Sequence, residues 1–362
     1  MIHYLTSYAQ PLRAPHTSET PLSPLGVEQA HLLGARLAAL GFGGCILSAP
    51  DHCALETARI LATHTGSEIQ TVAWLGTPTE GEIAKGYQAA VAEYPAEDVL
   101  FLGHHATCEQ LMGLMEYKHR VGTRQYNCAL SIFNPLSWKF VPTVYDTAHL
   151  PYEKTTLDGV SREALDRAAF ATPFEGEIPL PDLSQLRGER ILHIGDTESA
   201  TYPYYRKLIE LVRPDVILHT GDLADEVKIG RELHRRDEYV QKSAEMLSMM
   251  RASGARVILV SGNHDLPEEI ARLAPEAELY IGTGEVTLDG VPCRIGHRVD
   301  DMVFDRQYCF YGHGMAHDPW RWGFNQAGGQ YRFNVAFGSF ICDLASGVFL
   351  RIPRPTLVLP CP

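Results

Sequence analysis

The chain has 362 residues and a formal net charge of −13, with 45% apolar and 21% charged residues. This length predicts two domains of ordinary size, each with its own core. The acidic balance argues against non-specific binding to nucleic acid or to anionic membranes, because such binding needs a basic face. No apolar run approaches the ~18 residues of a membrane span, and the first residues do not read as a signal peptide. The eight cysteines form no CxxC pair, which indicates a reducing, cytoplasmic setting.

The first 150 residues alternate between strand patterns and helix patterns. Strands are predicted at 2–6, 45–48, 69–74 and 98–103, with a hairpin formed by 127–134 and 138–145. Helices are predicted from 24 to a stop at 41, and at 54–64, 86–93 and 109–117. Alternation of this kind is typical of an α/β layer fold.

Three stretches of this half resemble the histidine phosphatase (phosphoglycerate mutase-like) superfamily: 23–30, 48–58 and 146–150. The resemblance covers roughly residues 1–151 and implies a three-layer α/β domain. Where that family has Arg-His-Gly, this chain has Tyr8 in place of the nucleophilic His, and Cys53 replaces a phosphate-binding Arg. The second His of the family remains as His104. A phosphate pocket without its nucleophile or its cationic fork has no evident catalyst, so we expect this domain to be catalytically inactive.

A proline-rich stretch from 149 to 189 follows, with a short helix predicted from Ser161 to Phe170 and Ser161 as its N-cap. Such a stretch between two α/β patterns indicates a domain boundary. We therefore predict a degenerate histidine-phosphatase-like domain at 1–150, a linker at 151–188 and a second domain at 189–362.

In the second half, four short apolar runs each end in a glycine that is followed by a polar or metal-ligating residue. They lead into Gly195-Asp196-Thr197-Glu198, Gly221-Asp222-Leu223-Ala224-Asp225, Gly262-Asn263-His264-Asp265 and Gly312-His313-Gly314, and Gly296-His297-Arg298 lies between the last two. Runs of this kind predict buried strands. We expect the side chains that follow them to lie along one sheet edge, at the carboxyl ends of the strands, where ligands bind in open α/β sheets.

The residue types in these motifs favour a metal site. Carboxylates, amide oxygens and imidazoles bind divalent ions, and a carboxylate such as Asp222 can bridge two of them. Two ions about 3.5–4 Å apart can clamp a phosphate and ionise a water. Asparagine is an unusual metal ligand, which makes the Gly-Asn-His-Asp motif informative. The neighbouring His264 is placed to protonate a leaving oxygen.

These motifs resemble the calcineurin-like metallophosphoesterase superfamily, whose pattern is Asp-x-His, Gly-Asp-x-x-Asp, Gly-Asn-His-Asp, Gly-His and Gly-His-x-His. The resemblance covers roughly 190–355 and implies an α/β/β/α sandwich. Glu198 and Met315 stand where the family has histidines. The implied metal ligands are Asp196, Glu198, Asp222, Asn263, His297 and His313. The implied catalytic residues are His264 and Asp225, and the implied substrate-binding residues are Asn263 and Arg298.

From this pattern we expect two half-sites that differ in their affinity for a metal ion. The first comprises Asp222, Asn263, His297 and His313. The second comprises Asp196, Glu198 and the shared Asp222, and lacks an imidazole at Met315. We expect one or two divalent ions per chain. Mn is favoured because Glu198 suits Mn²⁺ or Mg²⁺, and Fe, Zn, Ni or Mg are alternatives.

Several residues keep two interpretations. His317 either replaces the imidazole missing at Met315 or is a solvent-exposed residue. Asp225 either orients His264 or caps a helix that begins near Glu226. Arg298 either binds a phosphate oxygen or forms a surface ion pair.

Three other features are expected to be structural. His193 and His219, inside strands, are predicted to be core residues. Trp320 and Trp322 either line a substrate cleft or pack, and packing is favoured. The charged run 228–236 is predicted to be a solvated helix face.

The favoured function is metal-dependent hydrolysis of a phosphomonoester or phosphodiester by the second domain. The alternative is a catalytically impaired scaffold that binds phosphate or a protein partner. The expected partner is a small phosphorylated substrate. Nucleic acid is not indicated but is not excluded, no membrane is expected, and the first domain could mediate homo-oligomerisation or bind a protein.

Overall fold

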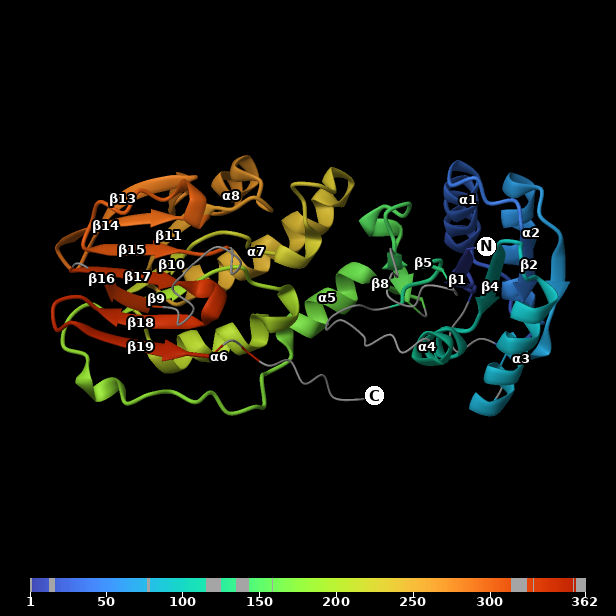
Figure 1. Ribbon diagram of the computed structural model, residues 1–362, viewed down its shortest axis with the longest axis horizontal. Coiled ribbons are helices and arrows are strands. Elements are labelled where there is room, and N and C mark those ends of the chain that lie inside the picture. The colour runs from blue at the N-terminus through green and yellow to red at the C-terminus, as the bar shows by residue number, and fades with distance from the viewer. Residues whose placement is uncertain are drawn as a thin grey trace. The chain divides into compact units, whose positions relative to one another are not determined.

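The computed structural model describes residues 2–12, 17–76, 79–114, 125–134, 143–157, 159–313, 324–327, 329–353 and 355. The chain divides into two compact units, Met1–Leu165 and Asp166–Pro362, and each is built around its own hydrophobic core. The two predicted α/β patterns therefore correspond to two separate bodies (Figure 1).

The first unit contains a six-stranded sheet with the order β3-β2-β4-β1-β5-β6. Its strands are β1 (His3–Ser7), β2 (Cys45–Ser48), β3 (Ile69–Thr71), β4 (Val99–Gly103), β5 (Leu130–Phe133) and β6 (Thr143–Asp146). Strands β3, β2, β4 and β1 are parallel, whereas β5 and β6 form the predicted antiparallel hairpin. The segment that joins β5 to β6 lies largely outside the described residues.

Four helices accompany this sheet: α1 (Pro24–Ala39), α2 (His52–Thr65), α3 (Glu80–Glu93) and α4 (His105–Leu114). From β1 the chain passes through α1 to β2 and through α2 to the edge strand β3, and α3 then leads it back to β4. Because parallel crossovers are right-handed, this reversal places α1 and α2 on one face of the sheet and α3 and α4 on the other. Accordingly α1 packs against α2, and α3 against α4. The result is the three-layer α/β arrangement that the resemblance implied.

Several predicted boundaries in this unit are wrong, among them the start of α4, which begins at His105 rather than at residue 109. Strand β3 ends at Thr71, and Ala73–Leu75 forms a 3-10 helix. Helix α3 begins at Glu80 rather than at residue 86, because Thr79 and Glu82 form a capping box. The Glu82 carboxylate accepts from both the backbone N–H and the hydroxyl of Thr79, at 2.8 Å each, which satisfies donors at the helix start.

The segment predicted as a linker contains regular structure. Strands β7 (Thr156–Leu157) and β8 (Val160–Ser161) pair, and helix α5 spans Arg162–Ala171. The Ser161 hydroxyl accepts from the N–H of Ala164 at 3.2 Å, as expected for the predicted N-cap. The boundary between the two compact units falls within α5.

The second unit contains two facing sheets. The first has the order β12-β11-β10-β9-β18-β19 and the second the order β13-β14-β15-β17-β16. The first comprises β9 (Ile191–Ile194), β10 (Val216–His219), β11 (Arg256–Ser261), β12 (Glu278–Ile281), β18 (Ser339–Asp343) and β19 (Val348–Ile352). The second comprises β13 (Thr283–Leu288), β14 (Val291–Gly296), β15 (Tyr308–Tyr311), β16 (Phe324–Ala327) and β17 (Gln330–Asn334).

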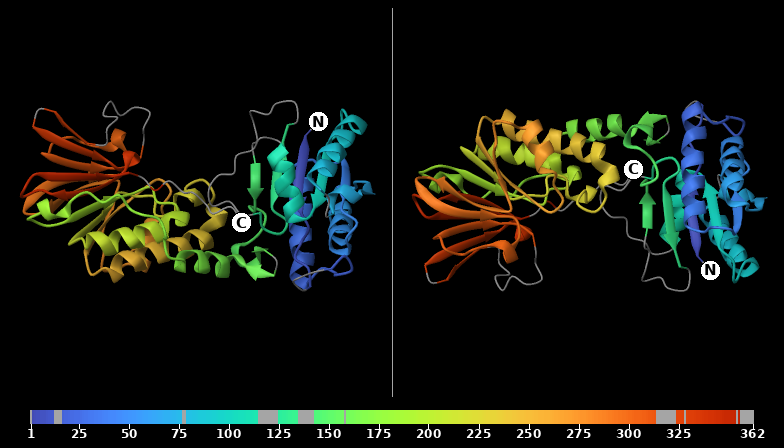
Figure 2. Two further views of the ribbon diagram at one scale, coloured as in Figure 1. Left: turned by 90° about the horizontal axis from the view of Figure 1, so that it is seen from below. Right: turned by 90° about the horizontal axis from the view of Figure 1, so that it is seen from above.

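Alternation along the strands of the first sheet explains the layers. Ile191 belongs to the core between the sheets, together with Phe310 and Phe333 of the second sheet. The next residue, Leu192, belongs to the core between the first sheet and the helices, because successive strand side chains point to opposite faces. Helices α6 (Tyr202–Val212), α7 (Arg236–Ala252) and α8 (Pro267–Leu273) accompany this sheet, and Figure 2 shows helices along its outer side. The predicted two-sheet sandwich is confirmed.

The charged run 228–236 is not a helix face. Helix α7 begins only at Arg236, and a 3-10 turn at Leu233–Arg235 precedes it. Lys228 adopts a left-handed backbone conformation with φ of 53°, which an α-helix does not accommodate. None of the described helices has the length and apolar character needed to cross a membrane.

We predict that Gly44→Ala destabilises the first unit, whereas the neighbouring Gly43→Ala does not. A Cβ at Gly44 would lie 1.7 Å from the carbonyl oxygen of Asp98, whereas a Cβ at Gly43 would meet no atom within 4 Å. Overpacking of this kind costs about 1–3 kcal/mol, and a tolerated Gly→Ala change is neutral or slightly stabilising. Differential scanning calorimetry of both variants, with hydrogen exchange of β2 and β4, measures the effect. Equal stability of the two variants would contradict the packing at this turn.

Candidate metal centre

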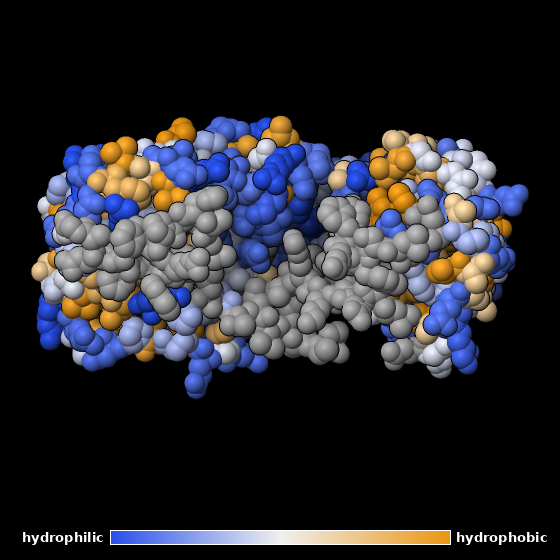
Figure 3. Space-filling view, viewed as in Figure 1, coloured by the Kyte–Doolittle hydropathy of each residue, from blue (hydrophilic) through white to orange (hydrophobic). Residues whose placement is uncertain are grey.

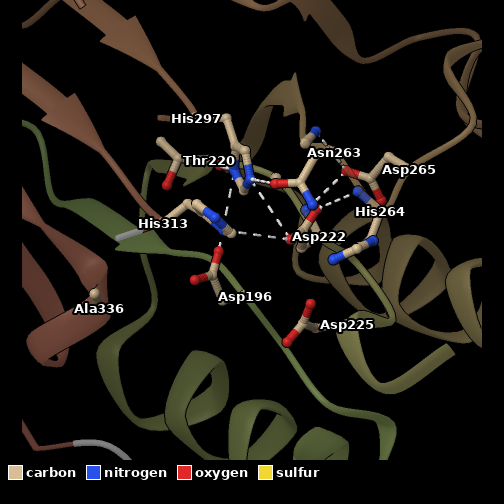
Figure 4. Close-up of polar contacts among 12 residues, drawn as sticks. Asp196, Thr220, Asp222, Asp225, Asn263, His264, Asp265, His297, His313 and Ala336 are labelled. Carbon is tan, nitrogen blue, oxygen red and sulfur yellow. Dashed lines mark hydrogen bonds and ion pairs between the residues drawn. The ribbon is translucent and has the colours of Figure 1, made fainter. Parts of the chain in front are cut away.

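The predicted ligand residues follow five strands of the two sheets. Asp196 follows β9, Asp222 follows β10 and Asn263 follows β11, in the first sheet. His297 and His313 follow β14 and β15, which are parallel neighbours in the second sheet. The sandwich thus brings the carboxyl ends of strands from both sheets to one place, and Figure 4 shows these side chains converging on Asp222.

Unusual backbone conformations turn these side chains into the site. Asp196, Asp222 and His313 all have positive φ, at 47°, 58° and 31°. Such conformations cost about 1–3 kcal/mol each in non-glycine residues and gather at functional sites. Each of these residues comes directly after a glycine that ends a strand run.

Two glycines allow the loops to touch. Gly221 has φ of 102°, and a Cβ there would lie 2.6 Å from Nδ1 of His297. A Cβ at Gly262 would lie 2.2 Å from Oδ1 of Asp222. The glycines in these two motifs therefore permit the close approach of the β10, β11 and β14 loops.

The metal-ligating atoms of Asp196, Asp222, His297 and His313 lie within 4.8 Å of one another. Oδ2 of Asp222 lies 3.5 Å from Nε2 of His297 and 4.0 Å from Nδ1 of His313. Nε2 of His297 also lies 3.0 Å from Oδ1 of Asn263. Four of the predicted ligands are thus gathered in one cluster, and Asn263 contacts it.

The hydrogen bonding of His297 indicates what this cluster can bind. Its Nδ1 donates to the carbonyl of Thr220 at 2.7 Å, which leaves Nε2 of the neutral ring as an acceptor. Nε2 then faces the acceptor oxygens of Asn263 and Asp222. Oδ2 of Asp222 is buried and accepts no hydrogen bond from any residue in the described part of the chain. Imidazole, amide and carboxylate ligand atoms that converge on one place are the arrangement that a divalent cation satisfies, so these residues fit a metal ion.

Electrostatics support the same conclusion. Burial, and next the nearby carboxylates of Asp265 and Asp196, raise the pKa of Asp222 to about 9. The negative form is disfavoured because it is buried among other carboxylates. A cation in the cluster would remove that penalty.

Asp265, which the sequence analysis did not assign to the site, holds two of the loops together. Its carboxylate accepts from the N–H groups of Gly262 (2.8 Å), Asp222 (2.7 Å) and Leu223 (3.0 Å), and from the hydroxyl of Tyr239 (2.9 Å). Hydrogen bonds to an ionised acceptor are stronger than neutral ones. Asp265 therefore fixes the backbone on which Asp222 and Asn263 are mounted, and its place in the Gly-Asn-His-Asp motif was the available signal.

His193 and His219 are fully buried, as expected of core residues. His193 contacts the hydroxyl of Thr220 at 3.1 Å, and His219 contacts that of Thr197 at 3.1 Å. His219 also accepts from the N–H of Gly221 through Nδ1, at 3.2 Å. Burial, and next the nearby His297, lowers the pKa of His219 to about 3. Both rings are therefore neutral supports of the metal loops.

His264 lies on the other side of Asp222 and is only 4% exposed. Its backbone N–H donates to Oδ1 of Asp222 at 2.8 Å. Metal-ligating atoms of His264, Asp222 and Asp225 lie within 4.8 Å of one another. Burial, followed by the charge of Lys228, lowers the pKa of the His264 ring.

Asp225 is the first residue of the 3-10 helix Asp225–Val227 and does not cap it, because the N-cap position belongs to Ala224. Its carboxylate instead accepts from the ammonium of Lys228. The capping interpretation is therefore wrong, and Asp225 is placed beside His264.

The remaining predicted residues are distributed differently. Glu198 is not among the clustered carboxylates, and its carbonyl accepts from the N–H and the hydroxyl of Thr201 at the start of a 3-10 turn. Arg298 is exposed beside His297, and no ion pair joins it to another described residue, so the surface ion pair is not observed. Met315, His317, Trp320 and Trp322 lie outside the described residues.

Residues 189–333 match the family of calcineurin-like phosphoesterases. Residues 6–77 match branch 1 of the histidine phosphatase superfamily. Both resemblances predicted from the motifs are confirmed. The first match supports phosphoester hydrolysis in general, and calcineurin-like phosphoesterases bind divalent metals. The clustered Asp and His residues all lie within the matched residues 189–333.

Several solved structures are similar to part of the chain. YhfR of Bacillus stearothermophilus is 18% identical, with a TM-score of 0.36, over 41% of this chain and 98% of its own. A phosphoserine phosphatase from Entamoeba histolytica in complex with 3-phosphoglyceric acid is 15% identical, with a TM-score of 0.35, over 41% and 98%. An ecdysone phosphate phosphatase from Bombix mori in complex with tungstate is 15% identical, with a TM-score of 0.30, over 40% and 95%. No curated protein matches the sequence.

We predict that Asp265→Ala weakens metal binding about 10–100-fold, the usual effect of removing a residue that orients metal ligands. Tyr239→Phe is the matched control, because it removes only one of the four hydrogen bonds to the Asp265 carboxylate and should have a smaller effect. Isothermal titration of the metal-free protein with Mn²⁺ measures both. Unchanged Mn²⁺ affinity in Asp265→Ala would show that the loops keep their positions without this carboxylate.

Proposed function

We propose that the phosphoesterase domain hydrolyses a phosphomonoester or phosphodiester in a metal-dependent reaction, and that the histidine-phosphatase-like domain is not catalytic. The observation that carries the proposal is the convergence of ligand atoms from Asp222, Asn263 and His297. A family that hydrolyses phosphoesters and binds divalent metals matches the same residues.

The residues that would hold divalent ions are Asp196, Asp222, Asn263, His297 and His313. Glu198 belongs to this set as a sequence prediction. Ions bound there would supply Lewis-acid activation of the phosphoryl group and of the attacking water. Mixed imidazole and oxygen ligands favour first-row metals, and Mn remains our first choice.

The chain's own residues then orient the substrate and move a proton. Asp222 is held in place by the N–H of His264, and its own N–H is held by Asp265. His264, beside the cluster, is the general acid that we propose for the leaving oxygen. Asp225 lies next to it, and its carboxylate accepts a hydrogen bond from the ammonium of Lys228. We therefore assign Asp225 to the positioning of the His264 ring. Arg298, exposed beside His297, is proposed to bind a phosphate oxygen.

The first domain lacks the groups for the chemistry of its family. Tyr8, at the nucleophile position, is 1% exposed, and Cys53 is fully buried. Burial raises the pKa of the Cys53 thiol to about 12, so this side chain stays neutral, and a thiol carries no positive charge in either protonation state. His104 pairs with Asp51 at 2.9 Å. We propose a structural or partner-binding role for this domain.

We predict that His264→Ala keeps its metal and loses rate, whereas Asp222→Asn loses metal and nearly all activity. Removal of a general acid typically costs ~10²–10⁴-fold in rate, whereas Asp222 carries the buried charge that compensates the ions. Metal content by mass spectrometry, and turnover of p-nitrophenyl phosphate and bis(p-nitrophenyl) phosphate with Mn²⁺, measure the two properties separately. Full activity in either variant would contradict the mechanism. A metal-loaded protein that turns over no ester would favour the scaffold alternative.

We predict that His104→Ala leaves the phosphatase and phosphodiesterase activities of the full chain unchanged. The reason is that the first domain has lost its nucleophile, so the remaining imidazole has no covalent intermediate to serve. Turnover of the same two esters measures this effect, with His264→Ala as the sensitive comparison. Trapping of a phosphohistidine in the first domain would refute the proposal.

A further inference from the structure

The segment Lys228–Glu232, here called the cationic loop, forms a tight turn beside the metal centre. The carbonyl of Lys228 accepts from the N–H groups of Arg231 (2.8 Å) and Glu232 (3.1 Å). At Gly230 a Cβ would lie 2.1 Å from the carbonyl oxygen of Asn263 and 3.5 Å from Nδ1 of His264. The backbone of the cationic loop therefore lies directly against the loop that carries Asn263 and His264.

A network of ion pairs beneath the cationic loop holds it in place. Lys242 of α7 is 6% exposed and donates to both Glu226 and Glu238, at 2.9 Å each. Arg235 pairs with Glu238 at 2.8 Å and donates to the carbonyl of Val227 at 3.0 Å. The residues on both sides of the cationic loop are thus fixed to α7. Support of this kind preorganises a binding element and reduces the entropy lost when a ligand binds.

The two cations of the loop differ in what they contact. Lys228 is bound to the carboxylate of Asp225. Arg231 is exposed, and its guanidinium makes no hydrogen bond or ion pair with any residue that the structure describes. Arg231 directly follows Gly230, where a Cβ would lie 3.5 Å from Nδ1 of His264. Figure 3 shows a largely hydrophilic surface over α7 and the segment next to it. Arg231 is therefore available to a ligand at the His264 side of the site.

We propose that Arg231 binds an anionic group on the leaving-group part of the substrate. The substrate class is then a phosphoester whose leaving group carries a second negative charge, on a phosphate or a carboxylate. This inference rests on the proposed function, because it takes His264 as the proton donor to the leaving oxygen. Groups beside His264 then face the leaving group, whereas Arg298 lies beside His297 on the other side of the cluster.

Charge and geometry favour an arginine in this role. A guanidinium can bind a phosphate or a carboxylate with two parallel hydrogen bonds. A chain with net charge −13 repels small anions at long range, so a local cation has a large effect on their binding. The carboxylate of Asp225 already engages Lys228, which leaves Arg231 as the residue of the cationic loop that discriminates between substrates.

The test compares phenyl phosphate with 4-carboxyphenyl phosphate and 1,4-phenylene bisphosphate, whose leaving groups carry a carboxylate and a phosphate. In Arg231→Gln, kcat/KM for the charged esters should fall about tenfold or more, mainly through KM, because a hydrogen-bonded charge pair is lost. Turnover of phenyl phosphate should change less than about twofold, because its leaving group offers no partner to Arg231. The two charged esters distinguish phosphate from carboxylate recognition. If the enzyme turns over only diesters, the methyl phosphodiesters of the same three compounds are used as the substrates instead.

Two further variants separate recognition from structural damage. Arg231→Lys should restore part of the preference for charged leaving groups. Arg251→Gln is the matched control, because Arg251 is exposed near the end of α7 and pairs with Glu276, away from the metal loops. An equal loss on all esters in Arg231→Gln, or no loss on any, would overturn the inference. Absence of turnover of every ester by the unaltered metal-loaded protein would instead refute the proposed function.

Discussion

Asp222 is a fully buried carboxylate whose neighbours are mainly other hydrogen-bond acceptors. Its Oδ2 faces Nε2 of His297 and is buried, and after burial the charges of Asp265 and Asp196 contribute most to its raised pKa. A group in this situation destabilises a fold unless a cation compensates it. The N–H of His264 and the carboxylate of Asp265 hold this side chain and its backbone in place.

Several features of the second unit serve that purpose at a cost in stability. Asp196, Asp222 and His313 adopt backbone conformations that side chains usually avoid. Asp265 compensates by binding three backbone N–H groups of the metal loops. The neutral imidazoles of His193 and His219 lie below the loops within the core. Strain at the site is thus balanced by hydrogen bonds and packing just behind it, as expected where a rigid scaffold presents functional groups.

The two domains show different consequences of losing site residues. In the first, we propose that a buried tyrosine and a buried cysteine occupy the positions of the nucleophile and the phosphate-binding cation, while the sheet and its helices are present. In the second, the residues that gather around Asp222 are retained, although Glu198 stands apart from them. A fold survives the loss of its catalytic residues because the core of alternating apolar side chains does not depend on them.

Sequence alone determined the strands that precede the metal loops, because short β-branched runs ending in glycine are a local signal. It also indicated the Asp and His residues that the structure gathers around Asp222, and the two family resemblances. It misplaced the start of α3, where the capping box of Thr79 and Glu82 extends the helix, and it misjudged residues 228–236 as a helix face. Charge pattern alone does not distinguish an exposed helix from a loop fixed by buried ion pairs. Only the tertiary structure brought Asp265 beneath two separate loops and Gly230 against Asn263, because such contacts join residues that are distant in sequence and leave no periodic pattern in it.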